Sequence, residues 1–541
     1  MFNTNFLITH TILLISDTNF MVSHKNFINQ LSNVIISIKN IVTLHSKQKL
    51  LDNTMELIIF IAFVAYTLLL FGITYITSRK ADSKSFFQGN KKSPWFVVAY
   101  GMIGASLSGV TFMSVPGWVN DRMFTYMLMV LGYFIGYLVI AFVLLPTYYK
   151  LNLVSIYKYL EKRYGKYSHK TGSFFFMLSR CLGASLRMFI VIIVLYNFVF
   201  KSWGLPFELT VALFLALILA FTIKGGVKTI IWTDTLQTTF MLAALVMCFV
   251  MVANELGFSF SGMIDNIAHS DYFTFIETDS MSRNCWWKQL LGGAFICIAM
   301  TGLDQEMMQK NLSCKNLKSA QKNMVTFSLI LFVVNFLFLM LGSALYIYKF
   351  KNGIAATGDA LFPEIAINHL PSIASIVFII GLISALFPSA DGALTSLTTA
   401  FCIDFLNFEG RQDKTEKQKT TIRHYVHLAF AVLFTAVIIF YYHNQNEHLI
   451  DILYQVASIT YGPLLGLFFF GLTTKRKVKD RFVPIVCVLA PVICFVLNNN
   501  SQEWFNYSFD FELLVLNGFL TFIGLLCISK KENKVPEIQN S

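Results

Sequence analysis

Residues 383–397 read "ISALFPSADGALTSL" and lie inside an apolar segment that runs from about residue 372 to 402. The stretch carries a proline, an aspartate and several hydroxyl side chains in a segment otherwise suited to hydrocarbon. A carboxylate at the centre of a bilayer costs roughly 2.5 to 3.5 kcal/mol even on the scale that gives the lowest values. A chain that keeps such residues gains something from them, so the stretch indicates a functional site inside a membrane.

The composition indicates a protein that crosses the membrane many times. Of 541 residues, 55% are hydrophobic and 13% are charged, and the mean hydropathy is +0.61. Soluble proteins carry about 25% charged residues, so much of this surface must face lipid. Apolar runs of about 18 or more residues predict thirteen spans: 57–78, 94–117, 126–146, 173–199, 207–222, 230–252, 287–305, 325–348, 372–402, 424–442, 449–473, 482–497 and 511–528.

Glycines interrupt the second and the seventh span, five spans apart. Gly101, Gly104 and Gly109 lie in one, and Gly292 and Gly293 lie in the other. Weak helices at corresponding places in two halves indicate an inverted-repeat transporter with helices broken at the midplane. Tight helix packing through small residues is the alternative. The expected fold class is therefore an all-α integral membrane protein of about 13 transmembrane helices.

The distribution of Lys and Arg predicts the orientation. With the first span running inward, the inner loops and tail hold 30 of the 42 Lys and Arg residues and the outer loops hold 6. We expect the N-terminus outside and the C-terminus in the cytoplasm of a cell whose inner (plasma) membrane holds the protein. The net charge of +12 then reflects this bias, so no nucleic-acid partner is needed. Nine scattered cysteines without a CxxC spacing suggest neither zinc nor disulfides.

The chain divides into five expected parts. Residues 1–54 form an N-terminal extension that lacks the features of a signal peptide, and we expect translation to begin at Met55. Residues 55–93 are a leading helix and inner loop, 94–473 the transport core, 474–528 two C-terminal helices, and 529–541 a cytoplasmic tail. The lipid bilayer is the expected partner, and a monomer suffices.

Two segments meet at one depth in the predicted bundle. Ser389 lies about 17 residues into its span, or ~25 Å at 1.5 Å per residue, just past mid-membrane. Pro388 has no N–H, so the carbonyl of Ser384 loses its helical partner. The second span reaches the same depth with the hydroxyls of Ser106, Ser108 and Thr111. Freed carbonyls and hydroxyls are the oxygen ligands that suit a dehydrated alkali cation.

Charged side chains within or near the spans are the other candidates. Asp234 and Asp391 are both displaced toward the cytoplasm, which suggests a second cation site or a release path; a structural hydrogen bond to neighbouring Thr and Lys is the alternative. Arg187 lies deep in its span and either pairs with a protein carboxylate or awaits an anionic solute. Arg180 is less expected to bind a solute. The run of residues 304–306, Asp-Gln-Glu, suggests a gate or a helix-end network.

Several motifs together resemble the sodium:solute symporter family. "SALFPSADGALTSLTTAFCIDF" resembles the family signature, and "GGVKTIIWTDTLQ", "GASLSGVTFMSVPGW" and "TGLDQEMMQK" resemble its fifth, first and sixth core helices. The resemblance runs from about residue 55 to 528. It implies the 5+5 inverted-repeat fold of the bacterial leucine transporter (the LeuT-type fold), with broken first and sixth core helices and sodium-driven uptake.

The resemblance also implies site residues. The sodium ligands would be the carbonyls of Gly104, Leu107 and Ala385 and the hydroxyl of Ser389. The neighbouring hydroxyl found in other members is Pro388 here, which leaves the site one ligand short unless the freed Ser384 carbonyl substitutes. Some members hold a second sodium beside the aspartate that matches Asp234. This chain has Asp391 and Gly392 where those members have hydroxyls.

The substrate is inferred from the first core helix and from Arg187. Ser106, Ser108, Thr111 and Arg187 look most like the sialic-acid branch of the family, and these four are the expected solute-binding residues. The predicted function is sodium-coupled import of a small polar solute, best an anionic sugar such as sialic acid. Alternatives are proton coupling; symport of a neutral sugar, an amino acid or a monocarboxylate; and a sensor that does not transport. An enzyme is not expected, because the ten His residues form no HExxH or similar motif.

Overall fold

The computed structural model describes residues 60–77, 83–411, 413–444, 449–507, 509 and 511–530. The predicted start of translation at Met55 and most of the predicted cytoplasmic tail lie outside these residues. The first described helix, Phe60–Thr77, is the predicted leading helix. Tyr66 on this helix accepts a hydrogen bond at 2.8 Å from the hydroxyl of Ser384, so the leading helix packs directly on the segment that carries the proline.

The first five core helices follow, joined by short turns. The elements are α3 (Ser83–Gln88), η1 (Gly89–Lys91), α4 (Trp95–Ser106), α5 (Gly109–Gly117), α6 (Val119–Arg122), η2 (Met123–Thr125), α7 (Tyr126–Val139), η3 (Ile140–Leu144), α8 (Leu145–Lys150), α9 (Lys158–Arg163), α10 (Lys166–Leu195), η4 (Tyr196–Phe200) and α11 (Phe207–Glu255). Helix α11 bends at Gly226, whose φ of 54° and ψ of −154° are not helical. It therefore supplies both the fourth and the fifth core helix.

The second five core helices begin after a loop that contains α12 (Phe260–Ala268). They comprise α13 (Trp286–Cys297), η5 (Ile298–Gly302), α14 (Gln305–Leu312), α15 (Leu317–Asn352), η6 (Gly358–Ala360), α16 (Leu361–Glu364), η7 (Ile365–His369), α17 (Ser372–Ala400), η8 (Phe401–Phe405), α18 (Glu416–His443) and α19 (Leu449–Thr473). From Phe378 onward almost every side chain of α17 is buried, so this helix is enclosed by protein and not by lipid.

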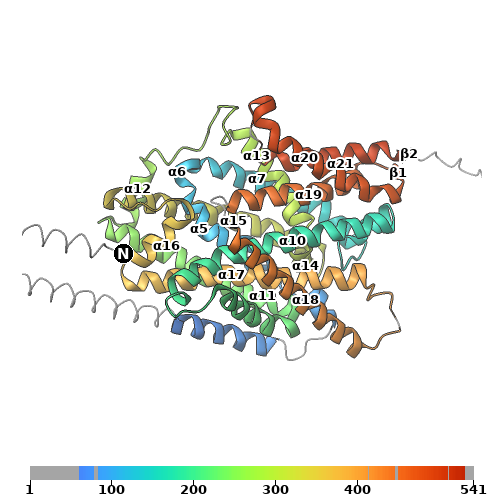
Figure 1. The fold of residues 1–541 in the computed structure, drawn as a ribbon, viewed down its shortest axis with the longest axis horizontal. Helices are drawn as coiled ribbons and strands as arrows, with labels where there is room; N and C mark the ends of the chain where they lie inside the picture. The colour runs from blue at the N-terminus through green and yellow to red at the C-terminus, as the bar shows by residue number, and fades with distance from the viewer. Residues whose placement is uncertain are drawn as a thin grey trace, which may run out of the picture. The chain divides into compact units, whose positions relative to one another are not determined.

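The last two helices of the described residues lie beside α19 (Figure 1). These are α20 (Val483–Phe505) and α21 (Glu512–Cys527), preceded by the short turn η9 (Asp480–Phe482). Strand β1 (Lys477–Val478) pairs antiparallel with β2 (Ser529–Lys530) and ties the ends of this pair together.

The helices account for the predicted spans, although not all of them reach full length. Among the described residues, nine helices are long and apolar enough to cross a membrane, and the bent pair α4–α5 makes ten. The other three predicted spans are helical but shorter: Phe207–Ala220, α13 with η5, and Glu512–Cys527. The chain is thus a multi-pass helical membrane protein, and the count of thirteen stays a prediction.

The second predicted span breaks where the sequence indicates. Helix α4 ends at Ser106, α5 starts at Gly109, and their axes differ by 60°. Leu107 has φ −88° and ψ 74°, which no helix contains. The break leaves the last carbonyls of α4 without their usual N–H donors.

The seventh predicted span breaks at a different place from its glycines. Gly292 and Gly293 lie within the continuous helix α13, and the break comes at Leu303 and Asp304, between η5 and α14. A Cβ atom at residue 293 would lie 2.2 Å from the carbonyl oxygen of Met129 on α7. These glycines therefore allow close helix packing, which is the alternative that the sequence left open, and the break of this span lies after them.

We expect Gly293→Ala to destabilise the protein strongly for this reason. The added methyl group meets a backbone carbonyl that cannot rotate away, and overpacking of this kind costs about 1–3 kcal/mol. The midpoint of thermal unfolding of the detergent-purified protein should fall by several degrees. Gly72→Ala is the matched control, because a Cβ at residue 72 meets nothing within 4 Å. Equal midpoints for the two variants would contradict the packing argument.

Candidate functional site

A polar cavity of about 110 Å³ lies at the break between α4 and α5. All four residues predicted to bind solute line it: Ser106, Ser108, Thr111 and Arg187. They come from α4, α5 and α10, so the fold brings together side chains up to 81 positions apart in the sequence. The N-terminal end of α5, which starts at Gly109, faces the same space. A helix N-terminus presents unpaired N–H groups and favours negative charge.

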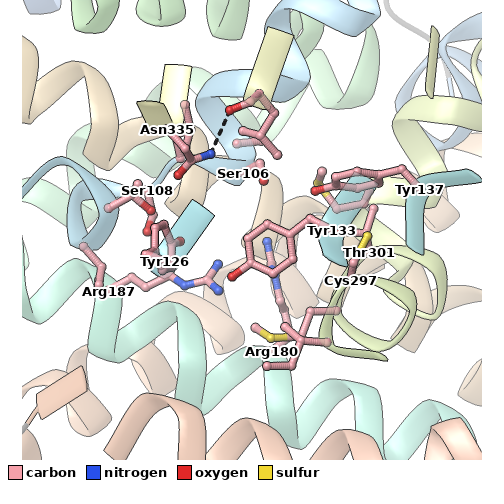
Figure 2. Close-up of a pocket in the computed structure, with 18 residues that line it drawn as sticks. Ser106, Ser108, Tyr126, Tyr133, Tyr137, Arg180, Arg187, Cys297, Thr301 and Asn335 are labelled. Atoms are coloured by element: carbon pink, nitrogen blue, oxygen red, sulfur yellow. Dashed lines mark hydrogen bonds between the residues drawn. The ribbon is translucent and has the colours of Figure 1, made fainter. Parts of the chain in front are cut away.

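The two arginines of α10 differ in what they contact. Arg180 is 5% exposed and pairs with Glu306; its Nη1 also lies 3.5 Å from Asp304 Oδ2. Arg187 is half-buried, and Figure 2 shows its guanidinium pointing into the middle of the cavity. Arg180 is thus held by protein carboxylates at the cavity wall, and Arg187 lines the same cavity one and a half to two helical turns further along α10.

The predicted sodium ligands lie beside this cavity, where α4 meets α17. A Cβ atom on Gly104 would lie 3.5 Å from the Pro388 ring, so the two helices touch at this level. The N–H of Gly104 donates to the Thr238 hydroxyl of α11 at 3.0 Å. Ala385 and Ser389 are buried on α17, and Leu107 sits at the break and also lines the cavity.

Several oxygen atoms on α17 and α11 are buried and have no hydrogen-bond partner within the described part of the chain. They are Ser389 Oγ, both carboxylate oxygens of Asp391, Thr395 Oγ1, Asp234 Oδ1 and Gln237 Oε1. Buried polar atoms are normally paired, and oxygens are the donors that a dehydrated Na⁺ takes. The residues of α11 and α17 therefore fit a sodium ion.

Two of these carboxylates belong to a buried network of charges. Lys310 Nζ donates to Asp234 Oδ2 at 2.7 Å and to Glu306 Oε1 at 3.3 Å. Asp391 interacts electrostatically with Asp234 and with Lys310. Asp234 and Asp391, predicted as a second cation site or release path, are thus brought near each other, and Lys310 bonds Asp234.

Asp304 closes the network at the break of the sixth core helix. Its Oδ1 accepts from the backbone N–H groups of Glu306 and Met307, which caps α14, and its Oδ2 accepts from the Tyr461 hydroxyl at 2.8 Å. Residues 304–306 thus form a buried helix-end network, one of the two alternatives that the sequence suggested.

Other cavity residues were not predicted from the sequence. They are Tyr126, Tyr133 and Tyr137 on α7, Cys297 and Thr301 before the second break, and Asn335 on α15 (Figure 2). A polar amide within the apolar span 325–348 is a signal that could have identified Asn335. The tyrosines gave no such signal, because aromatic residues are common in membrane helices at every depth of this chain.

Two broken helices, a buried helix with unpaired oxygens and a polar cavity between them define a secondary transporter of the inverted-repeat class. Residues 86–480 match the model of the sodium:solute symporter family. The chain belongs to this family, and it is a sodium-coupled symporter with the LeuT-type fold.

Similar proteins support the same assignment. The sodium/sialic acid symporter NanT of Aliivibrio fischeri is 23% identical over 479 residues, which cover 85% of this chain and 92% of the relative. The sodium/sialic acid symporter SiaT of Proteus mirabilis is 22% identical over 440 residues, 78% of this chain and 86% of the relative. A solved structure of a Na⁺-coupled sialic acid symporter, substrate-bound and outward-open, superposes with a TM-score of 0.75 at 18% identity, covering 88% of this chain and 99% of the other.

Proposed function

We propose that this symporter imports an anionic sugar of the sialic-acid type together with sodium. The observation that carries this proposal is the composition of the cavity: three hydroxyl residues from the first core helix, the α5 N-terminus and the guanidinium of Arg187 all face one space. Hydroxyls suit a sugar, and Arg187 with the helix end suits its carboxylate. The names of the relatives NanT and SiaT point to the same solute.

Sodium binds, in this proposal, between the carbonyls of Gly104, Leu107 and Ala385 and the hydroxyl of Ser389. The contact between Gly104 on α4 and the Pro388 ring on α17 supports this site, because Pro388 adjoins Ser389. An ion that bridges the broken helix and α17 stabilises the closed arrangement around the solute. Asp234 and Asp391 supply a second cation site or the path by which sodium leaves toward the cytoplasm. The membrane potential contributes about 2.3 kcal/mol per charge for each 100 mV.

The membrane arrangement follows from the same proposal. The N-terminus faces outward and the C-terminus the cytoplasm, so the basic loops lie inside and the protein imports across the inner (plasma) membrane. Residues 94–473 form the transport core, after the leading helix of 55–93, and 474–528 form an accessory pair. A monomer holds every proposed ligand, and the role is transport and not catalysis.

Uptake into proteoliposomes tests the proposal and its alternatives. Radiolabelled N-acetylneuraminate should accumulate with an inward NaCl gradient and not when choline replaces sodium at fixed pH. Accumulation in choline with an inward proton gradient would indicate proton coupling. If a neutral sugar, an amino acid or lactate is taken up with sodium and N-acetylneuraminate is not, that compound would be the transported solute. Solute binding without uptake would indicate a sensor.

A further inference from the structure

Glu306 contacts both a residue that lines the solute cavity and a residue of the buried charge network. It lies at the start of α14 and is 2% exposed. Its Oε2 accepts from the guanidinium of Arg180, which lines the solute cavity, and its Oε1 accepts from Lys310 Nζ at 3.3 Å. Lys310 in turn bonds Asp234 on the cation side. One side chain therefore links a cavity residue to the cation network.

The same carboxylate packs on α17 beside the proposed sodium ligand. A Cβ atom on Gly392 would lie 2.2 Å from Glu306 Oε1 and 2.5 Å from its Cδ. Gly392 follows Ser389 by three positions, so both lie on one face of α17. Glu306 occupies the space that a side chain at residue 392 would fill, and a movement of this face of α17 must displace it.

The two cations that Glu306 holds each have a second carboxylate. Arg180 lies 3.5 Å from Asp304, which is already engaged by Tyr461 and by two backbone N–H groups. Lys310 keeps Asp234 at 2.7 Å. Removing the charge of Glu306 therefore loosens the link between cavity and cation side, while neither cation is left buried without any counter-charge.

We propose that Glu306 is a positioning residue that transmits sodium binding at α17 to Arg180 in the wall of the solute cavity. This inference rests on the proposed sodium symport. Sodium that draws α4 and α17 together shifts the Gly392 face, and with it the carboxylate and the guanidinium bonded to it. Coupling of this kind is reciprocal, so solute must raise the affinity for sodium by the same factor.

The test measures that factor in the purified full-length protein. The half-saturating sodium concentration is determined by binding titration with and without saturating N-acetylneuraminate. In the wild type the ratio should lie within the roughly 5- to 150-fold range typical of coupled sites. In Glu306→Gln it should fall to about twofold or less, since the amide holds at most one of the two cations. A wild-type ratio in Glu306→Gln would overturn the proposal.

Asp404→Asn is the matched control. Asp404 is also buried, at 4% exposure, and is bonded to His169, Ser155 and Ser173, away from Glu306. This variant should lower the thermal midpoint but keep the wild-type ratio. If the ratio of half-saturating sodium concentrations also fell to about twofold in Asp404→Asn, removal of any buried carboxylate would impair the coupling. That result would overturn a specific role for Glu306.

A second variant and a second readout make the test independent of any single substitution and of the solute. Gly392→Ala should abolish the coupling too, because its methyl group displaces the Glu306 carboxylate.

The second readout is the rate at which N-ethylmaleimide alkylates Cys297, which lines the cavity. In the wild type and in Asp404→Asn this rate should differ between NaCl and choline chloride. Glu306→Gln and Gly392→Ala should both lose this difference, and its persistence in both would overturn the proposal. A wild type that responds to sodium but not to N-acetylneuraminate refutes only the solute, whereas a wild type indifferent to sodium refutes the symport itself.

Discussion

Arg187→Ala should abolish uptake of N-acetylneuraminate and weaken its binding about 100-fold. The side chain points into the cavity that also holds the predicted hydroxyls. Truncating one partner of a desolvated charge pair costs about 2–5 kcal/mol, and each 1.4 kcal/mol is a factor of ten. Arg187→Lys should recover only part of the loss, because lysine keeps the charge but cannot bind a carboxylate with two parallel N–H groups.

The methyl ester of N-acetylneuraminate isolates the contact that Arg187 makes. The ester has no carboxylate charge, so the wild type should bind it far more weakly than the acid. In Arg187→Ala the acid and the ester should bind about equally. A variant that still prefers the acid by the wild-type factor would remove Arg187 from solute recognition and leave it a structural role.

Ser389→Ala should raise the half-saturating sodium concentration by about 10-fold or more while the protein still reaches the membrane. Ser389 is 1% exposed, and its Oγ has no hydrogen-bond partner among the described residues. An unsatisfied buried hydroxyl costs roughly 1–3 kcal/mol, so its removal should not destabilise the sodium-free protein. The variant should instead lose most of the stabilisation that sodium gives the wild type in thermal unfolding.

Ser384→Ala is the matched control for this effect. The Ser384 hydroxyl lies on the same helix but bonds Tyr66 at 2.8 Å, so its loss should lower the thermal midpoint and leave the sodium response unchanged. If Ser389→Ala also kept the wild-type response to sodium, the hydroxyl would not be a ligand.

The features of the fold that could be predicted are those that a single segment of sequence is enough to identify. Thirteen apolar runs and the break after Ser106 could be located from sequence because a bilayer demands long apolar helices and a break needs small or polar residues. The second break could not be located from its glycines. Gly292 and Gly293 serve the contact with α7 and α21, and a glycine needed for packing looks the same in sequence as one needed for a bend.

The predictable part of the site is likewise limited to residues that stand out against their own span. Asp391, Arg187 and Ser389 interrupt apolar surroundings, and each lies at the cavity or the cation side. Glu306 belongs to the run that suggested a gate or a helix-end network, but its burial and that of Lys310 become visible only in the structure, where α14 packs against α11 and α17. The cavity tyrosines depend on the same three-dimensional information.

Sodium flux driven by solute tests the central claim most directly. In proteoliposomes with equal ²²Na⁺ concentrations inside and outside, an inward gradient of N-acetylneuraminate should drive net entry of ²²Na⁺. Ser389→Ala should reduce this flux at limiting sodium. Entry of N-acetylneuraminate without any movement of ²²Na⁺ would contradict a sodium ion held between the broken first core helix and α17.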